Sequence, residues 1–403
     1  MYKKNKTFVV KEMIRKVVRT KPINILLNAA GRIYTHERYV SFASLPDYSD
    51  NARAFFEYLT KLDYKGAFEG YQLVWHVKGN LEYYERKYPN VKFVKQHTLE
   101  SIRIFLASDY VVSTHGLYNA IAPSTNRKSI LVWHGMPLKK IGYLNQDDVK
   151  YGVPSADYYI VTSQLFKDLY KEIFHAADEQ ILLTGQPRND WLFQTVEKAQ
   201  EKAIHSLGER LIMYMPTFRK SNLRNTFDGN CTEENTIAFG GNRSQWESLN
   251  RELELTGQVM IIKPHPMDAI LNLDVLGGLP MVKVINDKWI EENNLTLYQL
   301  LAYTDKLITD YSSVYIDYLL LDRPMAFLFS DVAEYAGTRG FVFDDPMEFI
   351  PGKICQSFDD IRTFIAEKDQ YTEARARINI QFNKITDGTA SRNLFYQLNQ
   401  LFE

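Results

Sequence analysis

Alternation of short β-like runs with helical stretches is the feature of this 403-residue chain that most constrains its fold. Short apolar runs recur along the chain, and helical patterns such as 51–62 and 163–174 lie between many of them. Because parallel strands need a connection long enough to hold a helix, this alternation predicts βαβ units and a parallel sheet. The predicted strands of the first half are 23–29, 71–77, 91–94, 110–114, 130–133, 158–162 and 181–184.

The same alternation restarts near residue 205, which predicts a second domain of the same class. A chain of this length can bury two separate cores. We therefore predict two α/β domains, spanning 22–205 and 206–403, with a last helix that crosses back to the first domain. The polar, glycine-containing stretch 222–242 is typical of a long surface loop. The predicted strands of the second domain are 211–215, 259–263, 282–285, 306–309 and 325–329.

Composition and charge exclude several classes of protein. The hydrophobic share of 45% and the charged share of 24% are typical of a soluble globular chain. With a formal net charge of -1, the chain has no overall field that attracts a polyanion, so we expect no nucleic-acid partner. The two cysteines, Cys231 and Cys355, form neither a disulfide framework nor a zinc-binding spacing, which favours a reducing compartment.

Positive charge is concentrated at the N-terminus. Lysine and arginine predominate among the first 21 residues, where Glu12 is the one acidic residue. Apolar residues recur between them at helical spacing, which predicts a basic amphipathic helix over 1–21, of the type that lies on an anionic membrane surface. A solvated basic tail, or a helix packed on its own domain, is the alternative. No apolar stretch reaches the roughly 18 residues that span a bilayer, and no signal peptide is recognisable.

One predicted strand-turn-helix carries polar residues that suit a phosphate group. The strand ends in Thr309 and Asp310, and Ser312 and Ser313 come just before an apolar helix that contains Asp317. A helix N-terminus presents unpaired N–H groups and partial positive charge, so this turn predicts a phosphate-binding site. The alternative is an ordinary helix cap, since Asp and Ser are favoured capping residues.

Histidines follow predicted strands in both halves of the chain. His134 ends the strand 130–133, and the glycine and proline after it force a turn. An imidazole with an ordinary pKa near 6.5 accepts a proton at neutral pH, so His134 is a candidate base. In the second half, Lys263 and His265 follow a strand and are suited to neutralise a diphosphate. Either histidine can instead be an incidental polar residue at a strand end.

Further polar residues follow other strands, and each has a structural alternative. Thr217 and Arg219 come after the strand 211–215, and an arginine there can pair with a phosphate through two N–H groups. Three more segments either face a ligand or are only turns: 184–190, Arg339 with Gly340, and Asp387 with Gly388.

Motifs for several cofactors are absent from the sequence. No Gly-x-Gly-x-x-Gly follows a strand, which disfavours a dinucleotide oxidoreductase, and there is no Gly-Lys-Ser/Thr phosphate loop. No Asp-x-Asp occurs, which disfavours a diphosphate bridged by a metal. Because histidine, lysine, arginine and serine side chains can themselves carry diphosphate charge, we expect neither a cofactor nor a bound metal.

At these segments the chain resembles the CDP-glycerol:polyglycerophosphate glycerophosphotransferase family of teichoic-acid and capsule synthesis. The similarity covers nearly the whole chain after its basic N-terminus. Met136 departs from the family pattern, in which threonine is most frequent, and this departure bears on the acceptor pocket rather than on His134. The matching segments are 134–142, 263–266, 309–313 with Asp317, 339–340, 387–388 with Arg392 and, less distinctively, 48–51.

The resemblance implies a GT-B fold, in which two Rossmann-like domains face each other across a central cleft. It implies CDP-glycerol or CDP-ribitol as donor and an undecaprenyl-diphosphate-linked acceptor, at the cytoplasmic face of the cell membrane. By the same resemblance, His134 is the base that takes the acceptor proton, and His265 assists the departing CMP or stabilises the diphosphate. Together, the resemblance and the strand-end argument for Thr217 and Arg219 give the residues expected to bind substrate: Lys263, Thr217, Arg219, Thr309, Asp310, Ser312, Ser313, Asp317, Arg339, Gly340 and Asp387.

These features lead to the hypothesis of an in-line attack at phosphorus. The acceptor hydroxyl attacks the phosphate that bears the polyol, and CMP leaves. Three alternatives stay open: a ribitol-phosphate transferase, a nucleotide-sugar glycosyltransferase on the same fold, and a non-catalytic membrane-docked scaffold that keeps a nucleotide pocket. A primer enzyme and a polymerase are both compatible with the sequence, as are teichoic acid and capsule.

Overall fold

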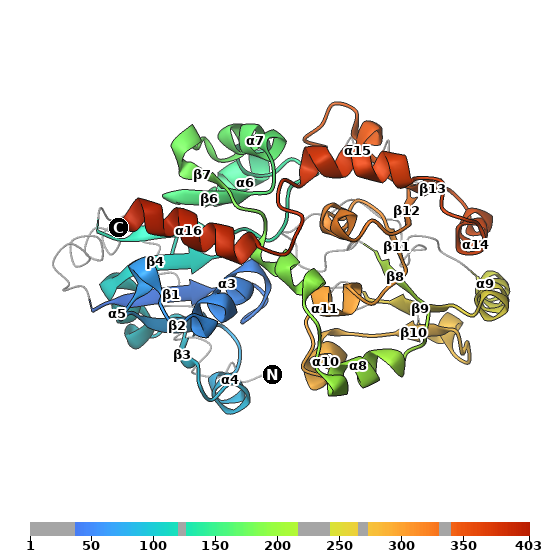
Figure 1. Cartoon of the computed structure of the whole chain (residues 1–403), viewed down its shortest axis with the longest axis horizontal. Coiled ribbons are helices and arrows are strands. Elements are labelled where there is room, and N and C mark those ends of the chain that lie inside the picture. The colour runs from blue at the N-terminus through green and yellow to red at the C-terminus, as the bar shows by residue number, and fades with distance from the viewer. Residues whose placement is uncertain (1–36, 120–125, 217–241, 265–272, 330–339) are drawn as a thin grey trace, which may run out of the picture. The chain divides into compact units, whose positions relative to one another are not determined.

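The structure is a computed structural model that describes residues 37–119, 126–216, 242–264, 273–329 and 340–403 (Figure 1). These residues divide into two compact units. Unit 1 contains residues 37–134, 142–190 and 389–403, and unit 2 contains the remaining described residues between 135 and 388. The end of the chain therefore belongs to the same unit as its first described residues.

Unit 1 is built on a seven-stranded parallel sheet with the order β3-β2-β1-β4-β5-β6-β7. The order runs outward in both directions from the middle, and it reverses between β1 and β4. In sheets of this kind, ligands bind beyond the carboxyl ends of the strands near that reversal. The strands are β1 (Tyr39–Ala43), β2 (Gln72–Val77), β3 (Lys92–Lys95), β4 (Ser108–Ser113), β5 (Lys128–Leu131), β6 (Tyr158–Val161) and β7 (Ile181–Leu183).

Helices cover both faces of this sheet, because successive side chains of a strand point to opposite faces. Val40 and Phe42 of β1 share a core with helices α3 (Asp50–Lys61) and α16 (Ala390–Phe402). Tyr39 and Ala43 face the other way and pack with α5 (Leu99–Ala107). Apolar side chains of α16 are fully buried in the first core, so the last helix completes unit 1. The other helices are α4 (Leu81–Lys87), α6 (Gln146–Tyr151) and α7 (Gln164–Phe174).

Unit 2 repeats this plan with a six-stranded parallel sheet of order β10-β9-β8-β11-β12-β13. Its core includes apolar residues of the inner strands and of helices α9 (Arg243–Thr256) and α14 (Phe358–Ala366). The strands are β8 (Leu211–Met215), β9 (Val259–Ile262), β10 (Val282–Val284), β11 (Lys306–Thr309), β12 (Met325–Leu328) and β13 (Lys353–Cys355). The remaining helices are α8 (Lys198–His205), α10 (Asp287–Glu292), α11 (Leu297–Leu301), α12 (Val314–Tyr318) and α15 (Thr372–Phe382).

The predicted α/β class with parallel sheets is confirmed, and two strands were missed. The strand β1 lies in the middle of its sheet, although Ser41 interrupts its apolar run. The buried Ser41 hydroxyl bonds to His76 Nε2 and Ser108 Oγ, both at 2.8 Å, so its polarity is satisfied inside the sheet. The strand β13 has three residues and lies at an edge, where a sequence pattern is weak. The predicted strand 23–29 lies outside the described residues.

The division between the units falls after Asp190, whereas the sequence placed a boundary near residue 205. The intervening helix α8 is tied to unit 2, because Lys283 Nζ donates to the carbonyls of Ser206 and Leu207 at 3.0 and 2.6 Å. Its Gln200 also donates to the Asn294 carbonyl. These contacts join residues far apart in the sequence, and a local pattern does not reveal them.

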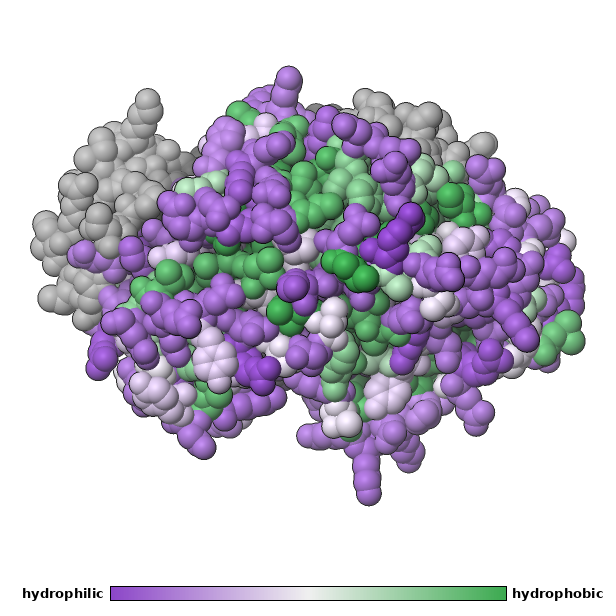
Figure 2. All heavy atoms as spheres, turned by 45° about the horizontal axis from the view of Figure 1, so that its top comes forward, coloured by the Kyte–Doolittle hydropathy of each residue, from purple (hydrophilic) through white to green (hydrophobic). Residues whose placement is uncertain are grey.

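One face of the molecule is predominantly polar. On the face that Figure 2 shows, polar side chains prevail and apolar ones appear in groups interrupted by polar residues. Among the described residues, no helix is long and apolar enough to cross a membrane. The predicted basic helix over 1–21 and the predicted loop over 222–241 lie outside the described ranges.

Candidate active site

Two histidines lie beyond the carboxyl ends of the neighbouring strands β4 and β5 in unit 1. His115 follows β4 and His134 follows β5, and their ring centroids are 4.2 Å apart with planes inclined by 3°. The indole of Trp133 joins them, with its centroid 4.3 Å from that of His134. A glycine with positive φ follows each histidine, Gly116 at 79° and Gly135 at 139°, so the chain turns sharply there.

The main chain around His134 is held by residues from two distant segments. Arg188 Nη1 donates to the His134 carbonyl at 2.9 Å and to both carboxylate oxygens of Asp50, at 2.9 and 3.0 Å. Asn51 Nδ2 donates to the carbonyls of Val132 and Trp133, at 3.0 and 3.1 Å, and Arg188 N donates to Asn51 Oδ1. We call Asp50, Asn51 and Arg188 the histidine clamp.

The histidine clamp holds backbone that is unfavourable on its own. Trp133 has φ of 43° and Asp50 has φ of 61°, in the left-handed region that side chains disfavour. Such conformations cost about 1–3 kcal/mol each and cluster at functional sites. The side chains of Arg188 and Asp50 are only 7% and 15% exposed, which strengthens their ion pair relative to a surface pair.

The environment keeps both imidazoles uncharged at neutral pH. Burial lowers the pKa of His134 well below its usual range, and the nearby His115 and Arg188 lower it further, against a smaller opposing effect of the Thr114 main chain. Burial also lowers the pKa of His115 to about 4. An uncharged imidazole can accept a proton, which is what a general base requires.

In unit 2, predicted site residues lie beyond the carboxyl ends of β9 and β11, the two strands that flank β8. The Lys263 ammonium is 2.8 Å from Asp287 Oδ1, and its side chain is largely buried. Thr309 Oγ1 donates to the Met215 carbonyl at 2.8 Å and so ties the end of β11 to that of β8. Asp310 follows directly and is buried. This edge thus combines a cation with a tightly fixed turn.

The turn between β11 and α12 does not use Ser313 as an ordinary cap. Ser313 occupies the N-cap position, yet its side chain makes no capping hydrogen bond. Ser312 Oγ accepts from Val314 N at 3.4 Å, a long contact. Tyr311 anchors the turn by stacking on Phe329, with centroids 4.9 Å apart and planes inclined by 7°. Both serines are half-buried, so their hydroxyls lie at the surface of this turn.

The remaining described site candidates have contacts inside unit 2. Asp317 on α12 is fully buried and accepts from the Tyr298 hydroxyl at 2.5 Å. Gly340 has φ of 70°, and its carbonyl accepts from Lys140 N at 3.2 Å, in a short antiparallel pairing of the segment after His134 with 340–342. Asp387 is exposed. The predicted site residues Thr217, Arg219, His265 and Arg339 lie outside the described ranges.

Sequence reasoning missed His115, and it left open what the turn 184–190 does. The signal for His115 was available, because a predicted strand followed by His-Gly occurs both there and at His134. The turn 184–190 has two structural roles. Its Arg188 belongs to the histidine clamp, and the carboxylate of its Asp190 accepts from Ala390 N and Ser391 N at the start of α16, at 2.8 and 2.9 Å.

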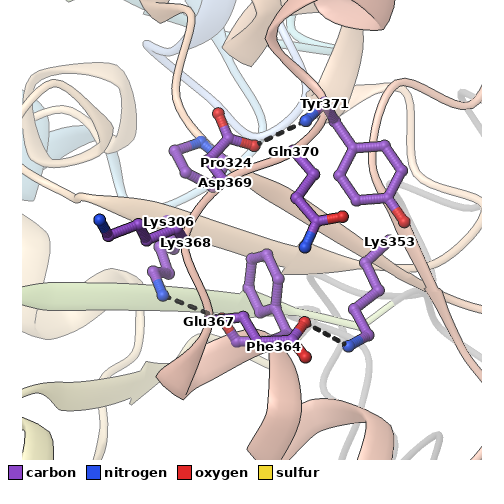
Figure 3. A pocket seen from close by; sticks show the side chains of 9 residues that line it. All are labelled: Lys306, Pro324, Lys353, Phe364, Glu367, Lys368, Asp369, Gln370 and Tyr371. Carbon is purple, nitrogen blue, oxygen red and sulfur yellow. Dashed lines mark hydrogen bonds and ion pairs between the residues drawn. The ribbon is translucent and has the colours of Figure 1, made fainter.

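A pocket of about 260 Å³ lies at the amino ends of the unit 2 strands, beside the first residues of β11 and β13 (Figure 3). Two of its lysines already have partners: Lys353 Nζ is 3.1 Å from Glu367, and Lys306 Nζ donates to the carbonyls of Phe364 and Ile365 at 2.9 and 2.7 Å. Lys306 therefore caps the C-terminal end of α14, which is a structural role. Within the described ranges, no group of three His, Cys, Asp or Glu side chains is arranged to hold a metal ion.

A comparison with known protein families identifies the family of this chain, over a range that includes both units. A sequence model of the CDP-Glycerol:Poly(glycerophosphate) glycerophosphotransferase family matches residues 27–399. The chain belongs to this family. The predicted resemblance is therefore confirmed, and with it the prediction of a phosphotransferase enzyme of teichoic-acid synthesis.

The individual proteins to which the chain is similar are enzymes of teichoic-acid synthesis. The chain is 29% identical to a teichoic acid glycerol-phosphate transferase of Staphylococcus aureus, over 92% of this chain and 98% of that protein. It is 28% identical to a teichoic acid glycerol-phosphate primase of Bacillus subtilis, over 74% and 75% of the two chains. It is also 27% identical to the teichoic acid ribitol-phosphate polymerase TarK of Staphylococcus aureus, over 72% and 55%.

Solved structures support the fold. The wall teichoic acid polymerase TagF matches with a TM-score of 0.74 and 22% identity, over 100% of this chain and 99% of that one. A Listeria monocytogenes protein described as a UDP-N-acetylglucosamine 2-epimerase matches with a TM-score of 0.52 and 14% identity, over 91% and 97%. The predicted GT-B class is confirmed, while the central cleft stays a prediction.

Proposed function

We propose that the chain transfers glycerol phosphate from CDP-glycerol to the hydroxyl of a lipid-linked acceptor, in the synthesis of wall teichoic acid or a related cell-surface polymer. The family match over residues 27–399 carries this proposal. The similarity to a glycerol-phosphate transferase over 98% of that protein's length supports it. CMP is the second product.

His134 is the proposed general base. Its uncharged imidazole takes the proton of the acceptor hydroxyl as that oxygen attacks the phosphorus bearing glycerol. The bond from this phosphorus to the oxygen of CMP breaks, and CMP carries away the electron pair. Base assistance of this kind contributes roughly 10²–10⁴-fold to a rate. The burial of His134 and the histidine clamp support this role, because they fix an uncharged imidazole at the carboxyl edge of a sheet.

The carboxyl edge of the unit 2 sheet is the proposed donor site. The Lys263 ammonium and the hydroxyls of Ser312 and Ser313 are suited to hold phosphate oxygens. Thr309 and Asp317 fix the segment that carries the two serines, and the buried Asp310 belongs to the same proposed site. His265 is proposed to assist the departure of CMP or to stabilise the diphosphate. The proposed site also includes Gly340 and Asp387 and, outside the described ranges, Thr217, Arg219 and Arg339.

The proposed place of action is the cytoplasmic face of the cell membrane, with an undecaprenyl-diphosphate-linked acceptor. Peripheral attachment through the basic stretch 1–21 would bring the enzyme to this acceptor. The excess of lysine and arginine there supports attraction to anionic lipid.

Release of CMP with a defined lipid-linked acceptor tests the proposal. The wild-type chain should release CMP from CDP-glycerol only when the acceptor is present, and His134→Ala should lower the rate by roughly 10²–10⁴-fold. His205→Ala is the matched control, because His205 is an exposed histidine on α8 of unit 2. Near-normal turnover by His134→Ala would remove the proposed base.

Ribitol phosphate is the second candidate for the transferred group. The similarity to the ribitol-phosphate polymerase TarK, at 27% identity, favours testing it. The same assay with CDP-ribitol decides between the donors, and transfer from UDP-sugars alone would instead indicate a glycosyltransferase. Binding of a nucleotide without turnover of any donor would indicate a scaffold.

A further inference from the structure

No carboxylate orients the buried Nδ1 of His134 within the described residues. A histidine base commonly donates from its second ring nitrogen to a carboxylate or carbonyl, which fixes the ring. Here Nδ1 of His134 is buried and has no hydrogen-bond partner among the described residues. The hydrogen bond of the histidine clamp to His134 is made to its main-chain carbonyl. Besides the main chain of Thr114, which acts on the ring, stacking contacts are available to fix the plane of the imidazole.

The ring of His115 makes such a contact. It lies parallel to the His134 ring within 3°, at a centroid separation of 4.2 Å, which is the geometry of a stacked pair. Trp133 contacts both imidazoles, with centroids 4.3 Å from His134 and 5.9 Å from His115. The three rings form a cluster, in which the ring of His115 is parallel to that of His134 and the indole of Trp133 is inclined to it by 35°.

His115 is itself held in place. Its Nδ1 is 2.8 Å from Thr114 Oγ1, and the same oxygen accepts from Leu45 N at 3.2 Å. The charged groups that act on the pair are Asp50 and Lys78, near His115, and Arg188, near His134. Burial outweighs them and keeps the His115 ring uncharged, since its pKa is about 4.

We propose that His115 is a positioning residue for the base: its fixed, uncharged ring holds the plane of His134 in the orientation in which the imidazole takes the acceptor proton. This inference rests on the proposed function of His134. The proton passes from the acceptor oxygen to a ring nitrogen of His134, and His115 neither gains nor loses one. Because Nδ1 of His134 is buried, Nε2 is the ring nitrogen that the acceptor reaches.

Steady-state kinetics of two substitutions test this role. His115→Ala removes the ring and should lower kcat about tenfold, which corresponds to about 1.4 kcal/mol, with KM for CDP-glycerol changed by less than about twofold. His115→Phe keeps a flat aromatic ring without titratable nitrogens and should restore kcat to within about threefold of the wild type. His205→Ala serves as the control for removing a histidine elsewhere.

A double substitution shows whether His115 acts through His134. In the His134→Ala background, His115→Ala should change the residual rate by less than about twofold, because the base is already absent. Full activity of His115→Ala would overturn the inference, and so would a His115→Phe enzyme as slow as His115→Ala. If the wild type itself releases no CMP, the proposed function fails instead, and the same variants with the donor it does use still decide the role of His115.

Discussion

Removal of Arg188 should destabilise unit 1, because it leaves two groups without their partner. Arg188 Nη1 bonds to both oxygens of Asp50 and to the His134 carbonyl. Deleting one partner of a fully buried ion pair costs roughly 3–5 kcal/mol, since the other charge stays buried and unpaired. The Asp50 side chain is 15% exposed, so water can compensate in part. We expect about 3 kcal/mol for Arg188→Ala, at the lower end of that range.

This loss is large against the roughly 5–15 kcal/mol that stabilise a typical domain. It should appear as a lower urea midpoint, measured by circular dichroism, in the transition to which unit 1 contributes. Arg188→Lys is the matched variant. It keeps the positive charge but lacks the planar fork, so its loss should lie between those of the wild type and Arg188→Ala.

The double variant Asp50→Ala/Arg188→Ala separates the ion pair from general damage. Removing both charges leaves no unpaired carboxylate, so the double variant should lose clearly less stability than the sum of the single losses. The reasoning would be refuted if Arg188→Ala had the urea midpoint of the wild type. It would also be refuted if the losses of the two single variants added to within about 0.5 kcal/mol.

Three further predictions concern other parts of the molecule. The folded chain holds His76 at a pKa of about 3 and His115 at about 4, through burial, so the unfolded chain binds protons first as pH falls below about 6.5. The free energy of unfolding should therefore decrease toward acid by about 1.4 kcal/mol per pH unit for each such histidine, down to its folded pKa. Urea titrations at several pH values measure this slope. A free energy of unfolding that stayed constant from pH 6.5 to 4 would contradict the prediction. Leu398→Ala on α16 removes a fully buried side chain from the unit 1 core and should cost about 2–5 kcal/mol in urea unfolding, whereas Leu401→Ala, at 44% exposed, should cost much less. Deletion of residues 1–20 should weaken binding to anionic liposomes in sedimentation assays, most clearly at low salt, and equal binding with and without them would remove the anchor.

The fold was readable from sequence wherever a strand was an unbroken apolar run. The strand β8 was predicted with the same bounds, because its apolar run is continuous. The strand β1 was not, because Ser41 looks polar in sequence, and only its partners His76 and Ser108 on neighbouring strands make it compatible with a core. Such compensation becomes visible only once the sheet order is known.

Part of the candidate site could be predicted because it, too, depends on where the strands end. His134 and Lys263 stand directly after predicted strands, where the end of a parallel strand is itself the signal. The histidine clamp depends on Asp50 and Arg188, which are distant in sequence and meet because the fold places the start of α3 beside the turn after β7. The capping interpretation of Ser313 differed from the structure, in which its side chain makes no capping bond. Periodicity and propensity carry no information about such contacts.

The decisive measurement is the mass of the lipid-linked product formed by the wild-type chain and by His134→Ala. With CDP-glycerol and a defined undecaprenyl-diphosphate-linked acceptor, the wild-type product should gain the mass of one or more glycerol-phosphate units, and His134→Ala should form little of it in the same time. An acceptor of unchanged mass with every CDP-polyol, or equal product from both proteins, would contradict a base-assisted transfer of glycerol phosphate.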